Sequence, residues 1–273
     1  MSEVTWPRRY YWSLRRELWE HPSIYVAPLA AGALAVLAYL VSSVRLVNQT
    51  RMGAVVLGQP FDFASGLVMF STIAVGVFYS LDTLYGERRD RSILFWKSLP
   101  VSDAVTVAAK VTVPLIILPL VTTAVTVLAL TVMIITGSLL TGSAHPPLVR
   151  SAVLLLYHMF TVHALWWAPF FGWMLLMSAW ARRAPFVWAV VPVLAISFAE
   201  RIALNTTYFT GMLQSRMNFS PEAVVAEGSM PIDPSTHVTA GLFLRSPGLW
   251  IGLAIMLAFA VLAARLRRSN SPI

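Results

Sequence analysis

Residues 82–110 read DTLYGERRDRSILFWKSLPVSDAVTVAAK and form a charged connector between two long apolar stretches. Large apolar side chains, Ile93-Leu94-Phe95-Trp96, stand among basic residues in its middle. A plain polar loop has no need of such a cluster, because contiguous apolar surface exposed to water is rare and usually marks an interaction site. The connector is therefore expected to pack against either the membrane surface or another protein.

The composition favours a membrane protein. Of the 273 residues, 58% are hydrophobic and only 12% are charged, whereas soluble domains carry about 25% charged residues. The chain has no cysteine, which excludes disulfides and Cys-ligated metal sites. The formal net charge is +8, but the basic residues stand beside apolar stretches. We therefore expect membrane topology to explain them, and no nucleic-acid partner.

Six stretches are apolar and reach the length of about 20 residues that a membrane helix needs. They are residues 24–47, 64–85, 111–140, 153–180, 186–204 and 248–264. The expected fold is an all-α integral membrane protein, with 1–273 as a single transmembrane domain of six helices. Residues 86–110 form a cytoplasmic loop, and 205–247 form an extracellular segment. Within that segment, 221–227 is predicted to be a short surface helix.

The basic residues predict the orientation. If the N-terminus is cytoplasmic, 14 of the 20 Lys and Arg residues fall on the inner side and six on the outer side. Basic residues accumulate on the cytoplasmic side of membrane proteins. Both termini and the connector are therefore expected in the cytoplasm.

Residues 1–23 predict an amphipathic helix that lies in the membrane interface, because aromatic and leucine residues recur there at helical spacing among arginines. The residues assigned to this interfacial helix are Trp6, Arg8, Arg9, Trp12, Arg15 and Arg16, with the arginines facing lipid phosphates. Two roles stay open for it: a simple anchor, or a surface that helps to dock a partner.

No sequence motif for catalysis is present. Phosphate-binding-loop, zinc-protease and serine-hydrolase motifs are absent, so we expect no catalytic residue, no metal and no cofactor bound by this chain. His158 and His163 are five residues apart and point from different faces of a helix, which favours structural roles. Asp82 is expected to pair with a nearby arginine or with Lys110.

The fourth apolar stretch is rich in aromatic residues. Trp166, Trp167, Phe170 and Trp173 lie too deep for an interfacial belt and surround Pro169, which should kink the helix and free a backbone carbonyl. These four residues are candidates for the wall of a substrate path, although ordinary packing is the favoured interpretation. Small residues in the first stretch, such as Gly32, allow close helix contact, either within the chain or in a dimer.

Residues 87–103, ERRDRSILFWKSLPVSD, resemble the first cytoplasmic loop of bacterial ABC-2 type permeases. In that family a charged stretch after the second span precedes an amphipathic coupling helix and a short turn, and a further helix leads into the third span. The architecture of the whole chain is similar to that of ABC-2 (type V) exporters, whereas the likeness at the level of sequence covers only residues 82–110. The Ile-Leu-Phe-Trp run is more apolar than in many relatives.

The resemblance implies a permease subunit of an ATP-driven exporter in the bacterial inner (cytoplasmic) membrane. It implies a second permease copy, with a homodimer preferred, and a separate cytoplasmic ABC ATPase that holds ATP and Mg²⁺. The residues implied in docking and coupling are Arg91, Ile93, Leu94, Phe95, Trp96 and Lys97. Ser102 and Asp103 are predicted to cap the following helix. A membrane receptor or lipid-binding anchor, and less favoured an intramembrane enzyme using His158, His163 or Glu200, remain alternatives.

Overall fold

The computed structural model describes residues 6–49, 59–98, 101–141, 148–217 and 240–269, and all elements within them are helical. The α-helices, in chain order, are α1 (Trp6–Glu20), α2 (Ser23–Gln49), α3 (Gln59–Arg89), α4 (Ser92–Ser98), α5 (Asp103–Thr112), α6 (Leu118–Thr141), α7 (Leu148–His158), α8 (Ala168–Trp180), α9 (Pro185–Ala199), α10 (Tyr208–Met217), α11 (Ala240–Arg245) and α12 (Pro247–Ser269). Three π-helical segments, η1 (Val113–Ile117), η2 (Met159–Trp166) and η3 (Glu200–Leu204), continue α5, α7 and α9.

Five helical stretches are long and apolar enough to cross a membrane: Ser23–Ser43, Phe63–Arg89, Asp103–Leu139, Pro185–Leu204 and Pro247–Ser269. A sixth arises only if the bent pair Leu155–Trp166 and Ala168–Trp180 counts as one span. The all-α class with several membrane-like helices is thus confirmed. The short helix predicted at 221–227 lies outside the described residues.

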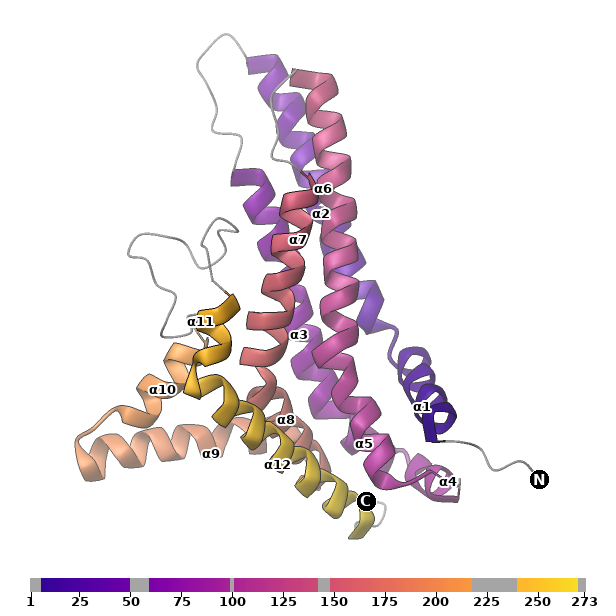
Figure 1. Ribbon diagram of the computed structural model, residues 1–273, viewed down its shortest axis with the longest axis vertical. Coiled ribbons are helices and arrows are strands. Elements are labelled where there is room, and N and C mark those ends of the chain that lie inside the picture. Colours follow the sequence, from indigo (N-terminus) through magenta and orange to yellow (C-terminus); the bar gives the residue numbers. More distant parts are fainter. Residues whose placement is uncertain (1–5, 50–58, 99–100, 142–147, 218–239, 270–273) are drawn as a thin grey trace.

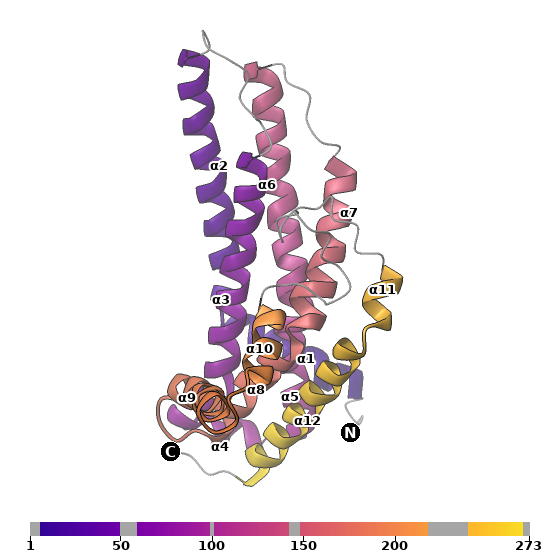
Figure 2. The ribbon, with the colours of Figure 1, turned by 90° about the vertical axis from the view of Figure 1, so that its left-hand side faces the viewer.

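The helices α2, α3, α6 and α7 run side by side along the long axis of the molecule (Figures 1 and 2). Helices α1, α4, α8 and α12 gather at the lower end in Figure 1, where both described chain ends lie. Helix α9 runs across the long axis and is seen end-on in Figure 2. The fifth predicted span is therefore not parallel to the first three in this conformation.

Short-range sequence signals set several of these elements. The Ser102 hydroxyl accepts a hydrogen bond from the Val105 amide at 3.3 Å and caps α5, as predicted. A Cβ atom added to Gly32 would lie 2.7 Å from the Val125 side chain, so the small residue allows α2 and α6 to pack closely. Of the two contacts left open for the first span, the structure contains the internal one.

The chain bends by 47° between η2 and α8, at the position where Pro169 predicted a kink. The freed carbonyl of Trp166 accepts a hydrogen bond from Arg216 of α10 at 3.1 Å, and the guanidinium of Arg216 stacks on the Trp166 ring, 4.5 Å from its centroid. The same guanidinium donates to the carbonyl of Gly248 at the start of α12. Arg216 thus joins α10 to the bend and to the last helix.

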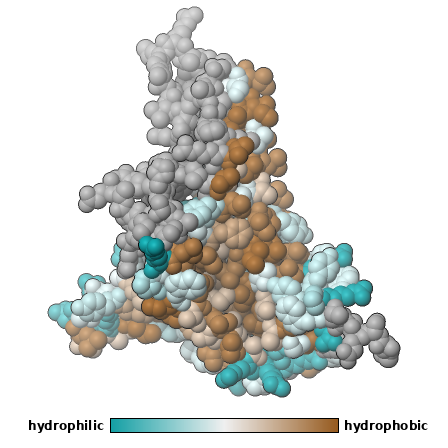
Figure 3. All heavy atoms as spheres, in the orientation of Figure 1, coloured by the Kyte–Doolittle hydropathy of each residue, from teal (hydrophilic) through white to brown (hydrophobic). Residues whose placement is uncertain are grey.

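Hydrophobic side chains cover the middle of the face shown in Figure 3, and hydrophilic ones gather over α1 at the right and at the lower edge, over the end of α12. Helix α9 with η3 differs from the other candidate spans, because only 6% of the residues in its apolar 18-residue stretch are buried inside the protein. Its exposed side chains are apolar around the helix, for example Phe186, Leu194 and Phe198. Lipid or another protein surface is needed to cover such a helix.

Candidate functional site

A group of buried charged side chains lies where the lower ends of α1, α3, α5 and α12 meet. We call it the ionic junction, and it consists of Arg16, Glu17, Glu87, Lys110 and Arg267. Glu17 is 0%, Lys110 1%, Arg267 4% and Glu87 6% exposed. Buried charges are retained only when they are paired and hydrogen-bonded, so the partners of each group decide what the junction does.

Lys110 lies at the centre of the ionic junction. Its Nζ donates to both carboxylate oxygens of Glu17, at 2.9 and 3.0 Å, and to the Thr83 hydroxyl at 2.7 Å. The same Nζ lies 3.1 Å from Oε1 of Glu87. Tyr79 also donates to Glu17, at 2.9 Å. One ammonium group therefore fastens α1 and α3 to α5.

Glu87 extends the junction to the last helix. Its Oε2 accepts from Nη2 of Arg267 at 3.0 Å, and its Oε1 accepts from Nη2 of Arg16 at 2.9 Å. Arg267 also donates to Asp103, the first residue of α5. The buried members of the junction are two cations, Lys110 and Arg267, and two carboxylates, Glu17 and Glu87, so no net charge is buried.

The local sequence explains why α1 presents Glu17 inward. Ser13 and Glu17 are one turn apart and are the buried residues of this helix. Leu14 and Leu18 pack beside them on a buried cluster that includes Ile24. Burial by itself raises the pKa of the Glu17 carboxyl, but the ammonium of Lys110 and the guanidinium of Arg16 outweigh it and lower this pKa to about 2. Glu17 is therefore ionised at neutral pH.

Helix α4 contacts the ionic junction through Trp96. The guanidinium of Arg16 stacks over the Trp96 ring, 4.1 Å from its centroid. On the other side, Lys97 Nζ donates to the carbonyl of Arg268 at 3.4 Å. Ile93 is 1% exposed and attaches α4 to the body of the protein. Helix α4 is thus in direct contact with both α1 and α12.

The rest of the predicted docking set faces outward. Leu94 and Phe95 are 59% and 60% exposed, which leaves two adjacent apolar side chains on the outside of α4. Arg91 is exposed in the turn before α4, where its φ of 57° places it in the left-handed region. The structure therefore divides this set into exposed residues and residues that reach inward.

The predicted interfacial set on α1 is divided in the same way. Trp6 and Trp12 are exposed, Arg8 is exposed and Arg9 is half-buried. Arg15 lies between two exposed rings, with its guanidinium 5.2 Å from the Trp12 centroid and 4.5 Å from that of Trp19. Arg16 instead turns inward, because Glu17 and Glu87 offer it carboxylate partners. Its assignment to lipid phosphates does not describe this structure.

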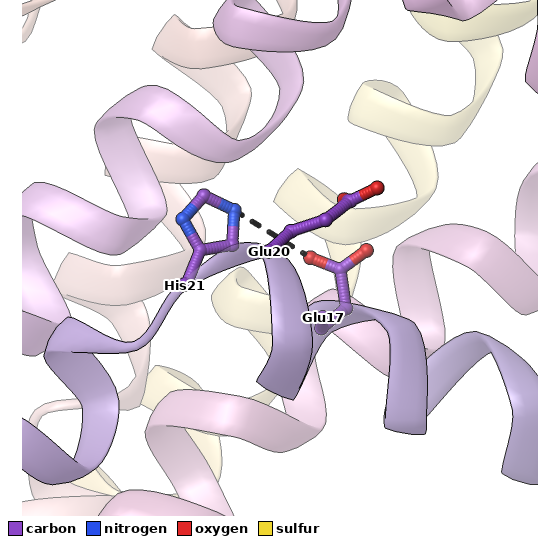
Figure 4. Close-up of side chains that lie close together, drawn as sticks. All are labelled: Glu17, Glu20 and His21. Atoms are coloured by element: carbon purple, nitrogen blue, oxygen red, sulfur yellow. Dashed lines mark ion pairs between the residues drawn. The ribbon is translucent and has the colours of Figure 1, made fainter.

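Glu17, Glu20 and His21 lie close together at the end of α1, with one ligand atom of each within 4.8 Å of the others (Figure 4). His21 Nε2 is 4.0 Å from Oε2 of Glu17. However, both oxygens of Glu17 already accept hydrogen bonds from Lys110, whose positive charge would repel a metal ion. The chemistry of this group favours ion pairing over metal binding.

The aromatic residues of the fourth predicted span are packed. Trp166 and Trp167 are buried with Phe171 and Phe243, and Phe170 lies at the edge of that cluster. Trp173 donates its indole N–H to the carbonyl of Ala189 in α9 at 2.9 Å. This placement favours packing over an open substrate path.

His158 is half-buried and His163 fully buried in the same region, the latter with its ring beside Phe171. Glu200 accepts hydrogen bonds from the backbone N–H of Phe209 at 3.0 Å and from Thr206 at 3.2 Å. This carboxylate therefore helps to hold the start of α10. None of the three is placed as a catalytic pair with another.

Asp82 pairs with an arginine, which is the first of the two partners expected for it, and Arg88 has partners that the sequence did not indicate. The carboxylate of Asp82 lies 3.9 Å from the guanidinium of Arg89, and both side chains are about half-exposed. Lys110 instead forms ion pairs with Glu17 and Glu87. Arg88 is buried, and its Nη2 donates to the carbonyls of Ser178 and Ala181 at 2.7 and 2.6 Å, which caps the C-terminal end of α8.

The ionic junction was missed by reasoning from sequence, although one signal pointed to it. Lys110 is the only Lys, Arg, Asp or Glu between residues 104 and 149. A single ionisable residue in an apolar helix calls for a buried partner, but the sequence does not say which of the twelve carboxylates it is.

Comparison with models of protein families, with curated proteins and with solved structures gives no match for this chain. The fold and the site thus define its class, an all-helical protein with several membrane-like helices and a buried ionic junction under an exposed short helix.

Proposed function

We propose that this chain is the permease subunit of an ATP-driven ABC exporter, which binds a separate cytoplasmic ABC ATPase through α4. The observation that carries the proposal is the division of α4 into two faces. Leu94 and Phe95 are exposed as anchors for a partner, while Trp96 contacts the ionic junction through Arg16. A helix with one free apolar face and one face tied to several long helices is suited to transmitting force.

The coupling would proceed from α4 through the ionic junction. A push on α4 acts on Arg16 through Trp96, and on α12 through the contact between Lys97 and Arg268. Lys110 and Asp103 are both on α5, which continues directly into η1. Because π-helical turns often occur at functional sites, η1 is the proposed pivot at which α5 moves relative to α6.

The resemblance of residues 87–103 to ABC-2 permeases supports the partner, the bacterial inner membrane and the outward direction of transport. A second copy of the chain is proposed as well, and the exposed apolar surface of α9 supports it. ATP and Mg²⁺ belong to the ATPase in this proposal. A lipid-binding anchor or receptor is the second candidate, favoured by the exposed Trp6, Trp12 and Trp19 of α1.

The decisive experiment is co-purification with a candidate ABC ATPase from the same organism, sought first in the adjacent reading frames. We expect the wild type to retain the ATPase and Leu94→Ser/Phe95→Ser to lose it while remaining folded. A matched control, Trp12→Ser/Trp19→Ser, removes exposed aromatic side chains from α1 and should retain it. Trp96→Ala should bind the ATPase but uncouple ATP hydrolysis from transport. Failure of the wild type to retain the ATPase would favour the anchor or receptor.

A further inference from the structure

A cleft of about 480 Å³ opens at the lower end of the molecule, between the end of α4, the start of α5 and the end of α12. Its size is in the range of small-molecule sites, roughly 300–1,000 Å³. Its charged wall residues are Lys97, Asp103, Arg265 and Arg268. The five residues of the ionic junction do not line the cleft, but Lys97, Asp103 and Arg268 of its wall also belong to the coupling path described above.

The charge of the cleft is positive. Asp103 is the single carboxylate among the residues that line it. This carboxylate already accepts a hydrogen bond from Arg267 of the ionic junction. In the part of the chain that the structure describes, no carboxylate lies within ion-pair distance of the guanidinium groups of Arg265 and Arg268. These two arginines, both exposed, and Lys97 therefore face a space that suits an anion.

The cleft is also continuous with apolar surface. Val261 and Ala264 line it one turn before Arg265 and Arg268, and Val261 is 45% exposed. Leu257, one turn before Val261 on the same helix, is exposed as well, so this side of α12 faces lipid if the helix spans the membrane. A ligand with an anionic head and an apolar tail fits both parts of the surface, whereas an acidic protein segment would use only the first.

We propose that this cleft binds the headgroup of an anionic phospholipid, with the phosphate between Arg265, Arg268 and Lys97 and an acyl chain along Val261. Each basic residue near a membrane surface strengthens the attraction to anionic lipid by about 1 kcal/mol, or about fivefold. The bound lipid would hold α4 against α12, because Lys97 is on α4 and the arginines are on α12. This inference does not depend on the transport activity.

Native mass spectrometry of the purified full-length chain tests the proposal, with phosphatidylglycerol and phosphatidylcholine titrated in parallel. We expect phosphatidylglycerol to bind in preference, and Arg265→Gln/Arg268→Gln to weaken it at least about tenfold. Arg265→Lys/Arg268→Lys should retain most of the binding. The matched control is Arg182→Gln/Arg183→Gln, which removes two exposed arginines from the loop between α8 and α9 and should change little.

Four results would overturn the proposal. Equal binding of both lipids by the wild type would show that the cleft does not select an anion. An equal loss in the two glutamine pairs would show attraction by overall charge instead of a site. Inorganic phosphate and glycerol phosphate are added as competitors, since displacement of lipid by either at micromolar concentration would make a free phosphate compound the ligand. Retention of lipid together with loss of the ATPase in Arg265→Gln/Arg268→Gln would assign the cleft to an acidic protein segment.

Discussion

The charge of Glu17 depends strongly on its surroundings, because this residue is fully buried and accepts hydrogen bonds from Lys110, Arg16 and Tyr79. Its pKa is lowered from 4.5 to about 2 in the folded protein. A depressed carboxyl pKa adds stability that is complete above pH 4.5 and is lost as the pH falls toward 2. The contribution at neutral pH is on the order of 3 kcal/mol.

We therefore expect Glu17→Gln to lower the thermal stability of the detergent-solubilised protein at pH 7, and the difference from wild type to shrink between pH 4.5 and pH 3. Thermal unfolding at a series of pH values measures this. Glu20→Gln is the matched control, since Glu20 is an exposed carboxylate on the same helix and should change stability by less than about 1 kcal/mol. A difference that grows on acidification would contradict the role given to Glu17.

At this scale the sequence predicted types of residue better than partners. The cap at Ser102 was predictable, because the Ser102 hydroxyl accepts from the amide of Val105, which is only three residues away in the sequence. Glu17 and Lys110 are 93 residues apart, and Glu87 and Arg267 are 180 apart. Such pairs exist only once the helices have packed, so a pattern along the chain cannot reveal them.

At the scale of elements, the contact between α8 and α12 depends on Gly172. A Cβ atom added there would lie 3.2 Å from Cα and 3.3 Å from the carbonyl oxygen of Met256. These are backbone atoms and cannot move aside by changing rotamer. We expect Gly172→Ala to destabilise the protein by about 1–3 kcal/mol, measured by thermal unfolding in detergent.

Gly211 in α10 is the matched control, because a Cβ added there would meet no atom within 4 Å. Alanine is the better helix former, so Gly211→Ala should leave the stability unchanged or raise it by up to about 1 kcal/mol. Equal losses in both variants would show that helix packing does not distinguish the two positions.

The elements themselves follow from local chemistry, but their directions do not. Apolar length indicates a helix at 186–204, and Pro169 indicates a bend. The direction of α9 follows from the turn at Ala184, which has a φ of 49°, and from the hydrogen bond between Trp173 and Ala189. The first is an unusual conformation for alanine and the second is a long-range contact, so neither is visible in the sequence.

At the scale of the whole molecule, α12 contacts α10 near its start and α4 near its end. Gly248 near its start contacts Arg216 of α10, and Arg268 near its end contacts Lys97 of α4. A helix of 23 residues is about 35 Å long, close to the thickness of about 30 Å of the hydrocarbon core. If α12 spans the membrane, α10 and α4 must therefore lie on opposite sides of it.

The absence of cysteine from the chain makes single-cysteine labelling a clean test of this arrangement. Gln214→Cys on α10 and Ser269→Cys at the end of α12 place one thiol at each end, on residues that are exposed. Because most basic residues lie on the side of α4, we expect a membrane-impermeant maleimide to label Gln214→Cys in intact cells and Ser269→Cys only after permeabilisation. Ser98→Cys on α4 should behave like Ser269→Cys. Labelling of all three positions from one side would mean that α12 does not cross the membrane, and α4 would then share its aqueous compartment with α10.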